Sequence, residues 1–277
     1  MKRQLVQHSA FSIQRSFVNG GLFRTLLMAC FIGPWSALWG VLAMLCGALR
    51  WKAACRWILR CWSGGLVSAA GIRVQVQRPL PPTPSRDGEG AGGGPHTQPC
   101  LFFSNHQSAL DIPILLQACL PTHDVRFLAK ESLFRIPIFG WGMRLSGFIP
   151  IRRESARHSA EIFQEMIGAH GPGGRSYIIF PEGTRSPDGR LQALKKGAIG
   201  LAWRMNLPVV PVTLIDACRA NPKGKLLVRP GTVRVVFHEA IKVAANSGRE
   251  QRDALAAQVF SAICSALPED QQPLSEG

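Results

Sequence analysis

The chain has 277 residues, of which 46% are hydrophobic and 18% charged, so it can form a large core and disorder throughout its length is excluded. It carries 32 Lys and Arg against 17 Asp and Glu, a formal net charge of +15. Such an excess suits nucleic acid, an anionic membrane surface or an anionic substrate. Eleven of the basic residues lie within residues 1–86, which contain no acidic residue, so most of the excess charge belongs to the N-terminal part.

The N-terminal part contains a long apolar run. Residues 25–49 are uncharged and are flanked by Arg24 and Arg50. A helix of this length can cross the ~30 Å hydrocarbon core of a bilayer. Gly33-Pro34 is expected to break the run, and basic residues on both flanks then favour a monotopic pair of helices at the cytoplasmic face of the cell inner membrane. A single membrane span and a buried helix of a soluble protein are the alternatives.

Residues 51–69 place three tryptophans among basic side chains, a composition that suits a lipid headgroup interface. The alternative is a surface helix packed on its own domain. The eight cysteines form no C-x-x-C pair and do not cluster with His at metal-ligand spacing, so reduced thiols and no metal site are expected.

After residue 71 the pattern changes to alternating strands and helices. Residues 72–77 alternate apolar and polar side chains, and residues 79–99 are so rich in Gly and Pro that a flexible loop is expected. The predicted strands then cover residues 100–104, 125–129, 148–151, 177–180, 209–214 and 232–237. The predicted helices cover residues 110–119, 155–169, 195–205 and 249–266. This alternation predicts an α/β layered domain with a mixed, largely parallel sheet.

One histidine has a context that suggests chemistry. His106 follows the apolar strand 100–104, at the carboxyl end of a strand, where α/β sheets carry their functional groups. Asp111 lies five residues later and could accept a hydrogen bond from the imidazole, which leaves the other ring nitrogen free as a general base. A capping box from Ser108 to Asp111 is an equally good interpretation. Ser108 is a weaker nucleophile candidate because the glycines of a nucleophile elbow are absent.

A second polar turn follows the strand 177–180. In it Gly183 can expose backbone N–H groups, Thr184 supplies a hydroxyl and Arg185 supplies a planar fork suited to phosphate, although an ordinary polar turn has the same composition. Two arginines, Arg152 and Arg153, follow a third strand. Further cations near strand ends or helix starts are Lys130, Lys195 and Lys196, each of which could simply be solvated. Together these turns predict a site that binds a phosphate and deprotonates a neighbouring hydroxyl.

The motifs resemble the lysophosphatidic acid acyltransferase family of glycerolipid acyltransferases. Asn105-His106-x4-Asp111 matches its N-H-x4-D motif, and residues 180–186 match its F-P-E-G-T-R-S motif. Residues 147–153 resemble a third block, with Arg153 in the arginine position, and residues 210–212 resemble its V-P-V block. The sequence departs from the family pattern at three places: Arg152, residues 194–197 where the family has F-K-x-G, and the long loop 79–99.

The resemblance implies a glycerol-3-phosphate acyltransferase-like layered domain over residues 66–268, preceded by membrane-anchoring helices over 1–65 and followed by a tail over 269–277. It implies transfer of a fatty acyl group from acyl-CoA or acyl carrier protein to the sn-2 hydroxyl of 1-acyl-glycerol-3-phosphate, which gives phosphatidic acid. His106 would be the base and Asp111 its partner. The residues implied in substrate binding are Asn105, Lys130, Arg153, Glu182, Gly183, Thr184, Arg185 and Lys195.

The resemblance implies no cofactor and no metal, and acyl-CoA or acyl carrier protein would be the co-substrate. The expected partners are an anionic phospholipid membrane, a lysophospholipid acceptor and the acyl carrier, and no nucleic acid. Acylation of another lyso-lipid, such as a lyso-ornithine lipid, is the alternative within this class. A non-catalytic basic protein that binds membranes or nucleic acid is the alternative from another class.

Overall fold

A computed structural model describes residues 25–26, 28, 30–49, 51–78, 99–151, 175–205, 207–225, 228–243 and 248–274, without the side chains of Lys52 and Arg204. The predicted helix 155–169, Arg152, Arg153 and all but the last residue of the predicted loop 79–99 lie outside these residues.

The centre of the molecule is a seven-stranded sheet with the order β1-β7-β6-β2-β5-β3-β4. All neighbouring strands are parallel except β6 and β7, which are antiparallel, so the prediction of a mixed, largely parallel sheet is confirmed. The strands are β1 (Ile72–Gln77), β2 (Leu101–Ser104), β3 (Val125–Lys130), β4 (Ile149–Ile151), β5 (Ser176–Ile179), β6 (Val209–Ile215) and β7 (Gly231–Phe237).

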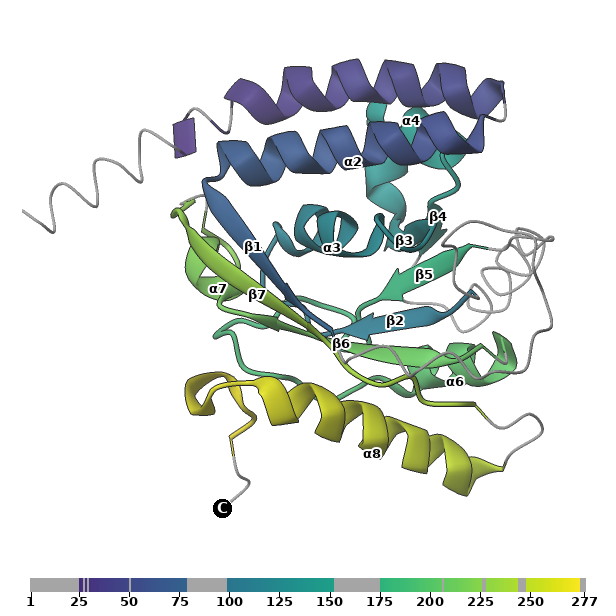
Figure 1. Cartoon of the computed structure of the whole chain (residues 1–277), viewed down its shortest axis with the longest axis vertical. Helices are drawn as coiled ribbons and strands as arrows, with labels where there is room; N and C mark the ends of the chain where they lie inside the picture. Colours follow the sequence, from purple (N-terminus) through teal and green to yellow (C-terminus); the bar gives the residue numbers. More distant parts are fainter. Residues whose placement is uncertain are drawn as a thin grey trace, which may run out of the picture.

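Helices cover both faces of the sheet (Figure 1). On one face lie α2 (Lys52–Ala69) and α3 (Asp111–Cys119), and on the other lie α6 (Lys196–Met205) and α8 (Arg249–Ala266). Alternate residues of β2 point to the two cores: Phe102 belongs to the first, and Leu101 and Phe103 to the second. Central strands buried on both faces explain the continuous apolar runs in the sequence.

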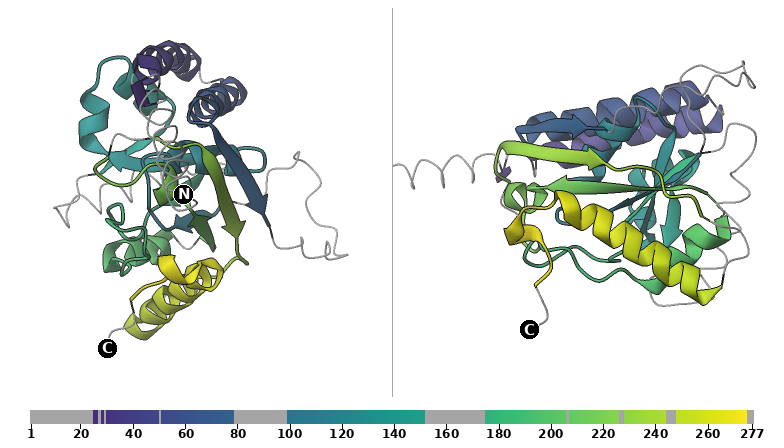
Figure 2. Two further views of the ribbon diagram at one scale, coloured as in Figure 1. Left: turned by 90° about the vertical axis from the view of Figure 1, so that its left-hand side faces the viewer. Right: turned by 60° about the horizontal axis from the view of Figure 1, so that its bottom comes forward.

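The first helix, Cys30–Ala48, lies antiparallel beside α2 and forms an outer layer (Figures 1 and 2). The Nε1 of Trp35 donates to the carbonyl oxygen of Trp62 at 3.0 Å, and the Nε1 of Trp62 donates to the Oγ of Ser36 at 3.1 Å. The first helix and α2 therefore form a hairpin that is tied together by tryptophan hydrogen bonds. Helix α2 packs on α3, so residues 51–69 form a helix on the surface of their own domain.

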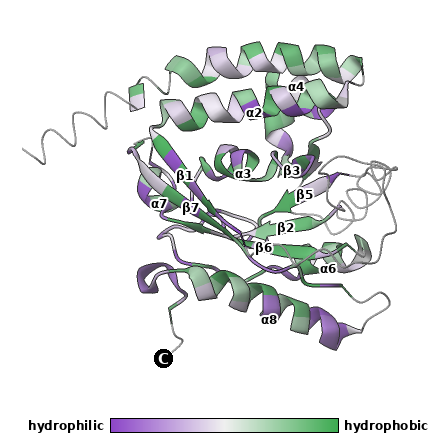
Figure 3. Ribbon diagram, viewed as in Figure 1, coloured by the Kyte–Doolittle hydropathy of each residue, from purple (hydrophilic) through white to green (hydrophobic). Residues whose placement is uncertain are grey.

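The predicted break at Gly33-Pro34 is wrong, because the helix Cys30–Ala48 continues through both residues. The proline lies near the N-terminal end of this helix, and the packing of Trp35 and Ser36 on α2 outweighs the local preference of the proline. The helical pair is consequently made from the apolar run and α2, rather than from two halves of the run. The first helix is long and apolar enough to cross a membrane, and its outward side is apolar (Figure 3).

Short elements were not predicted. They are the 3₁₀ turns Glu131–Arg135 and Glu269–Gln271 and the helices α4 (Phe139–Leu145) and α7 (Ala217–Ala220). α4 packs against the first helix through two glycines, since a Cβ on Gly142 would lie 2.8 Å from the carbonyl oxygen of Gly40. Within the predicted tail 269–277, Gln271 is buried and Leu191 N donates to its carbonyl oxygen at 3.0 Å, so this part of the tail packs on the domain.

Candidate functional site

The structure places His106 and Asp111 in direct contact. The imidazole Nδ1 lies 2.7 Å from Asp111 Oδ2, and Asp111 is fully buried. Asp111 begins α3, and the loop between β2 and this helix turns the imidazole back onto its carboxylate. The same Oδ2 accepts the backbone N–H groups of Gln107 at 2.6 Å and Ser108 at 2.8 Å. The carboxylate is thereby fixed and can hold the imidazole in one orientation.

The capping box is only half formed. Asp111 accepts from the Ser108 N–H, as the reciprocal arm of a capping box would, but the Ser108 hydroxyl accepts from Leu110 N at 3.1 Å rather than from Asp111 N. The residue preceding the helix is Leu110, which makes no side-chain cap. The two interpretations of Asp111 are therefore compatible: the same carboxylate orders the helix start and binds His106.

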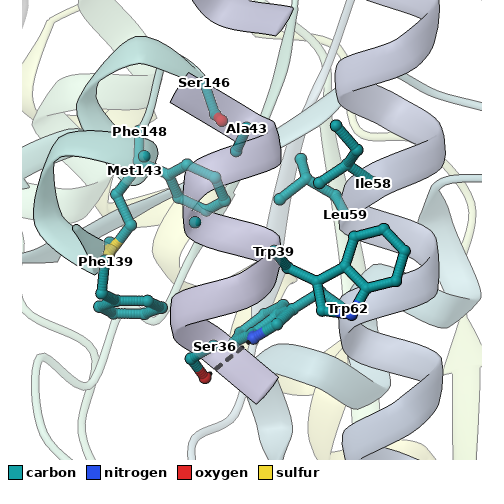
Figure 4. A pocket seen from close by; sticks show the side chains of 12 residues that line it. Ser36, Trp39, Ala43, Ile58, Leu59, Trp62, Phe139, Met143, Ser146 and Phe148 are labelled. Carbon is teal, nitrogen blue, oxygen red and sulfur yellow. Dashed lines mark hydrogen bonds between the residues drawn. The ribbon is translucent and has the colours of Figure 1, made fainter. Parts of the chain in front are cut away.

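An aromatic row leads away from the histidine. The His106 ring stacks on Phe180 with centroids 3.9 Å apart, Phe180 stacks on Phe127 at 6.0 Å, and Phe127 stacks on Phe148 at 6.3 Å. Phe148 also lines an apolar cavity between the helical hairpin and α4 (Figure 4). This cavity is small, with a volume of about 40 Å³. Its lining includes Trp39, Trp62, Phe139 and Met143.

Glu182 links the two motifs. Its Oε1 accepts the backbone N–H of His106 at 2.7 Å, its Oε2 accepts that of Gln192 at 3.3 Å, and the side chain is buried. Burial raises the pKa of Glu182 to about 8, although these N–H donors and Lys223 favour the charged form. Each oxygen accepts one backbone N–H, so Glu182 ties the turn after β5 to the loop that carries His106; its predicted contact with substrate stays a prediction.

Asn105 is also occupied by the backbone. Its Nδ2 donates to the carbonyl oxygen of Leu214 at 2.8 Å, and its Oδ1 accepts from Leu214 N at 2.7 Å. These two bonds attach the loop after β2 to β6. Asn105 thereby fixes the residue that precedes His106, and its predicted contact with substrate stays a prediction.

The turn after β5 presents cations and donors. Gly183 has φ +72°, and the Lys195 side chain lies over it, with Nζ 3.0 Å from the position that a Cβ would occupy. Lys223 Nζ donates to the carbonyl oxygen of Arg185 at 2.6 Å and approaches Thr184 Oγ1 at 3.5 Å. Within the described residues, no ion pair or side-chain hydrogen bond occupies the Arg185 guanidinium. The turn thus leaves Arg185 and Lys195 able to bind an anion.

Two further predicted cations within the described residues are Lys130 and Lys196, and Lys196 begins α6. Lys130 is exposed at the end of β3, paired in register with Ile151 at the end of β4. Arg153, two residues beyond Ile151, lies outside the described residues. Among the described residues, no three His, Cys, Asp or Glu side chains come together as a metal site would require.

Sequence reasoning missed three groups at the site. Lys223 lies in a loop after α7 and Gln271 in the C-terminal turn, neither within a recognised motif. Gln107 is part of the first motif but was treated only as its spacer; its Nε2 donates to the Gly189 carbonyl at 2.8 Å and to Gln271 Oε1 at 2.9 Å. Only the tertiary fold brings these residues to the site, so no local pattern could have identified them.

Comparison with known proteins is consistent with this geometry. A sequence model described as Acyltransferase matches residues 72–215. A chloroplastic 1-acyl-sn-glycerol-3-phosphate acyltransferase of Brassica napus is 39% identical over 144 residues, which cover 52% of this chain and 41% of that protein. The 1-acyl-sn-glycerol-3-phosphate acyltransferase of Pseudomonas aeruginosa is 28% identical, with 79% of this chain and 80% of that protein covered.

A solved structure shares the fold. The crystal structure of the 1-acyl-sn-glycerophosphate acyltransferase of Thermotoga maritima superposes with a TM-score of 0.68 at 26% identity and covers 88% of this chain and 92% of that one. The chain matches about two fifths of the length of the Brassica napus protein. Since the matched family model covers more than half of the chain, with strands β1 to β6, the His106–Asp111 pair and the Arg185 turn, the chain belongs to the acyltransferase family.

Proposed function

We propose that this protein transfers a fatty acyl group from acyl-CoA or acyl carrier protein to the free sn-2 hydroxyl of 1-acyl-glycerol-3-phosphate, forming phosphatidic acid. The observation that carries the proposal is the buried His106–Asp111 pair, with 2.7 Å between Nδ1 and Oδ2, attached through Glu182 to a turn with available cations. The names of the relatives from Brassica napus and Pseudomonas aeruginosa support the same acceptor.

The pair supplies a general base. Because the Asp111 carboxylate accepts a hydrogen bond from Nδ1–H, Nε2 is the unprotonated nitrogen of the neutral ring. Nε2 takes the proton of the acceptor hydroxyl while its oxygen attacks the thioester carbonyl. The tetrahedral intermediate then collapses, the C–S bond breaks, and the leaving thiolate takes the proton from the imidazolium. Asp111 stabilises the imidazolium between these steps, and no acyl-enzyme forms.

The acceptor phosphate would bind beside this base. Arg185 offers the planar fork that suits phosphate oxygens, and Lys195 places its ammonium group over the exposed backbone of Gly183. Thr184 supplies a hydroxyl, Lys130 would add charge from the end of β3, and Arg153 is proposed to contribute a further charge. Binding the phosphate here holds the glycerol hydroxyl next to His106, which makes the reaction effectively intramolecular.

The helical hairpin would hold the enzyme at the cytoplasmic face of the inner membrane, where lipid acceptor and soluble donor meet. Supporting this, the first helix exposes Leu38 and Leu45 by 54% and 57%, Leu49 directly after it is 74% exposed, and α2 exposes Trp57 by 61%. Because the first helix packs on α2 and α4, an in-plane hairpin accounts for the contacts without separating it from the domain.

A thiol-release assay tests the proposal. The full chain in detergent is given acyl-CoA with and without lysophosphatidate, and then with other lyso-lipids, including a lyso-ornithine lipid. We expect acceptor-dependent release that is fastest with lysophosphatidate and falls ~10²–10⁴-fold in His106→Ala. His123→Ala is the matched control, because His123 precedes β3 at the opposite end of the sheet. Wild-type turnover in His106→Ala would refute the mechanism, and no acceptor-dependent release would refute the activity.

A further inference from the structure

The C-terminal turn Glu269–Gln271 contacts the loop after β2, which carries His106. Gln271 is 2% exposed, and its Oε1 accepts from the Gln107 side chain at 2.9 Å. Its Nε2 donates to Asp216 Oδ1 at 2.7 Å, and its Oε1 also accepts from Asp216 N at 3.3 Å. One buried amide therefore bridges the loop after β2 and the turn after β6.

The same network includes the turn after the second motif. Gln107 Nε2 donates to the Gly189 carbonyl at 2.8 Å, and Leu191 N donates to the Gln271 carbonyl at 3.0 Å. Arg190 attaches the C-terminal turn from outside, with Nη1 2.8 Å from the Gln272 carbonyl. Three loops that carry or flank the site thus converge on Gln271.

Gln107 transmits this contact to the catalytic pair. It is the residue after His106, and its backbone N–H donates to Asp111 Oδ2 at 2.6 Å, the oxygen that also binds the imidazole. The Gln107 side chain also donates to the Gly189 carbonyl at 2.8 Å and accepts from Cys218 N at 3.4 Å, so the loss of Gln271 removes one of three anchors. With a weaker anchor the Gln107 backbone can shift, and the His106–Asp111 contact shifts with it. Displacements of about 1 Å at a reacting group are enough to cost ~10²-fold in rate.

We propose that Gln271 is a positioning residue, and that the C-terminal turn Glu269–Gln271 acts through Gln107 to hold His106 and Asp111 in the geometry required for base catalysis. This inference rests on the proposed acyl transfer for its kinetic consequence. Its structural consequence, an ordered loop over residues 105–111, can be measured without any activity.

The first experiment compares neighbouring glutamines. In Gln271→Ala we expect kcat to fall about tenfold, with KM for both substrates changed less than twofold, because the substrate contacts are untouched. Hydrogen exchange should rise at residues 105–111. Gln272→Ala is the matched control: its Nε2 donates only to the Leu267 carbonyl at 3.0 Å, within its own segment, so neither measurement should change.

The second experiment exchanges donor and acceptor in the hydrogen bond between residues 271 and 216. Gln271→Glu places a carboxylate against Asp216 and should lower kcat as much as Gln271→Ala does. Adding Asp216→Asn lets the new amide donate to the new carboxylate, which still accepts from Gln107, so kcat should return to within about twofold of wild type. Asp216 has φ +68°, a conformation that Asn tolerates well. The double variant also tests the inference if Gln271→Ala does not fold.

The inference is overturned if Gln271→Ala keeps wild-type kcat and exchange, if Gln272→Ala loses as much, or if the double variant stays as slow as Gln271→Glu. A wild-type chain that transfers no acyl group refutes the proposed function instead. In that event the exchange rates of residues 105–111 alone decide whether Gln271 orders the loop.

Discussion

Glu182 Oε1 accepts the backbone N–H of His106 at 2.7 Å, so the turn after β5 holds the turn after β2. On the other side of the same residue, Ser186 N donates to the His106 carbonyl at 2.7 Å. The peptide groups of the histidine are therefore clamped by two residues of the second motif. The two sequence motifs are one structural unit, in which the second positions the base of the first and leaves Arg185 free to contact an anion.

The clamp predicts a pH dependence of stability. Burial raises the pKa of Glu182 from 4.5 to about 8, so the folded chain favours the neutral acid and ionisation opposes folding as the pH rises between these values. Asp111 opposes ionisation further, while Lys223 and the two N–H donors favour it. The substitution Glu182→Gln removes the ionisation penalty, because an amide does not titrate, and keeps an oxygen acceptor for His106 N. Relative to that variant, the wild-type free energy of unfolding should fall by about 4 kcal/mol between pH 5 and pH 8.5.

Urea unfolding of both proteins across this pH range measures the difference. If the two stability curves run parallel from pH 5 to pH 8.5, Glu182 does not titrate as its burial implies. Lys223→Met provides a further check, since removing the cation should raise the pKa of Glu182 and make the loss of stability with pH steeper than in the wild type.

The second prediction separates backbone strain from a lost contact. Gly183 and Gly224 both have positive φ, +72° and +77°, so an alanine at either position costs about 1 kcal/mol of stability. Only at Gly183 would the new Cβ also meet the Lys195 side chain, 2.9 Å from its Cδ, whereas nothing lies within 4 Å at Gly224. Gly183→Ala should therefore raise the acceptor KM several-fold, and Gly224→Ala should leave it unchanged. If Gly183→Ala and Gly224→Ala lose the same stability and change the acceptor KM equally, Lys195 does not contact the acceptor.

Local patterns were sufficient for the strands, for α8 and for the placing of His106 and Asp111, because each depends on side chains close in the sequence. They were insufficient where distant segments meet. Asn105 and Glu182 appear in motifs as polar residues available to substrate, yet both are occupied by backbone groups of Leu214, His106 and Gln192. The continuous helix through Pro34 likewise depends on packing against α2, which no local preference encodes.

The third prediction concerns the anion site. Arg185→Ala should raise the KM for lysophosphatidate at least tenfold, because a charge-assisted contact to phosphate is lost, and should change the KM for acyl-CoA much less. Arg135→Ala is the matched control: this exposed arginine pairs only with Glu131, at 3.6 Å within one 3₁₀ turn. Steady-state kinetics with each substrate varied in turn make the comparison. Equal increases in both KM values would assign Arg185 a general structural role instead.

The last prediction tests the membrane face of the hairpin. Leu38 and Leu45 are seven residues apart, on one side of the first helix, and are 54% and 57% exposed. If this side enters the lipid interface, replacing both leucines with glutamate loses apolar burial and adds repulsion from anionic headgroups, which should weaken binding at least tenfold.

Sedimentation with vesicles that contain anionic phospholipid measures the binding. The control is Leu274→Glu, which alters a leucine that is 71% exposed beyond the C-terminal turn. Turnover of a water-soluble, short-chain lysophosphatidate should be the same in all three proteins, because the substitutions leave the His106–Asp111 pair intact. Unchanged vesicle binding in the double variant would mean that another surface holds the protein at the membrane.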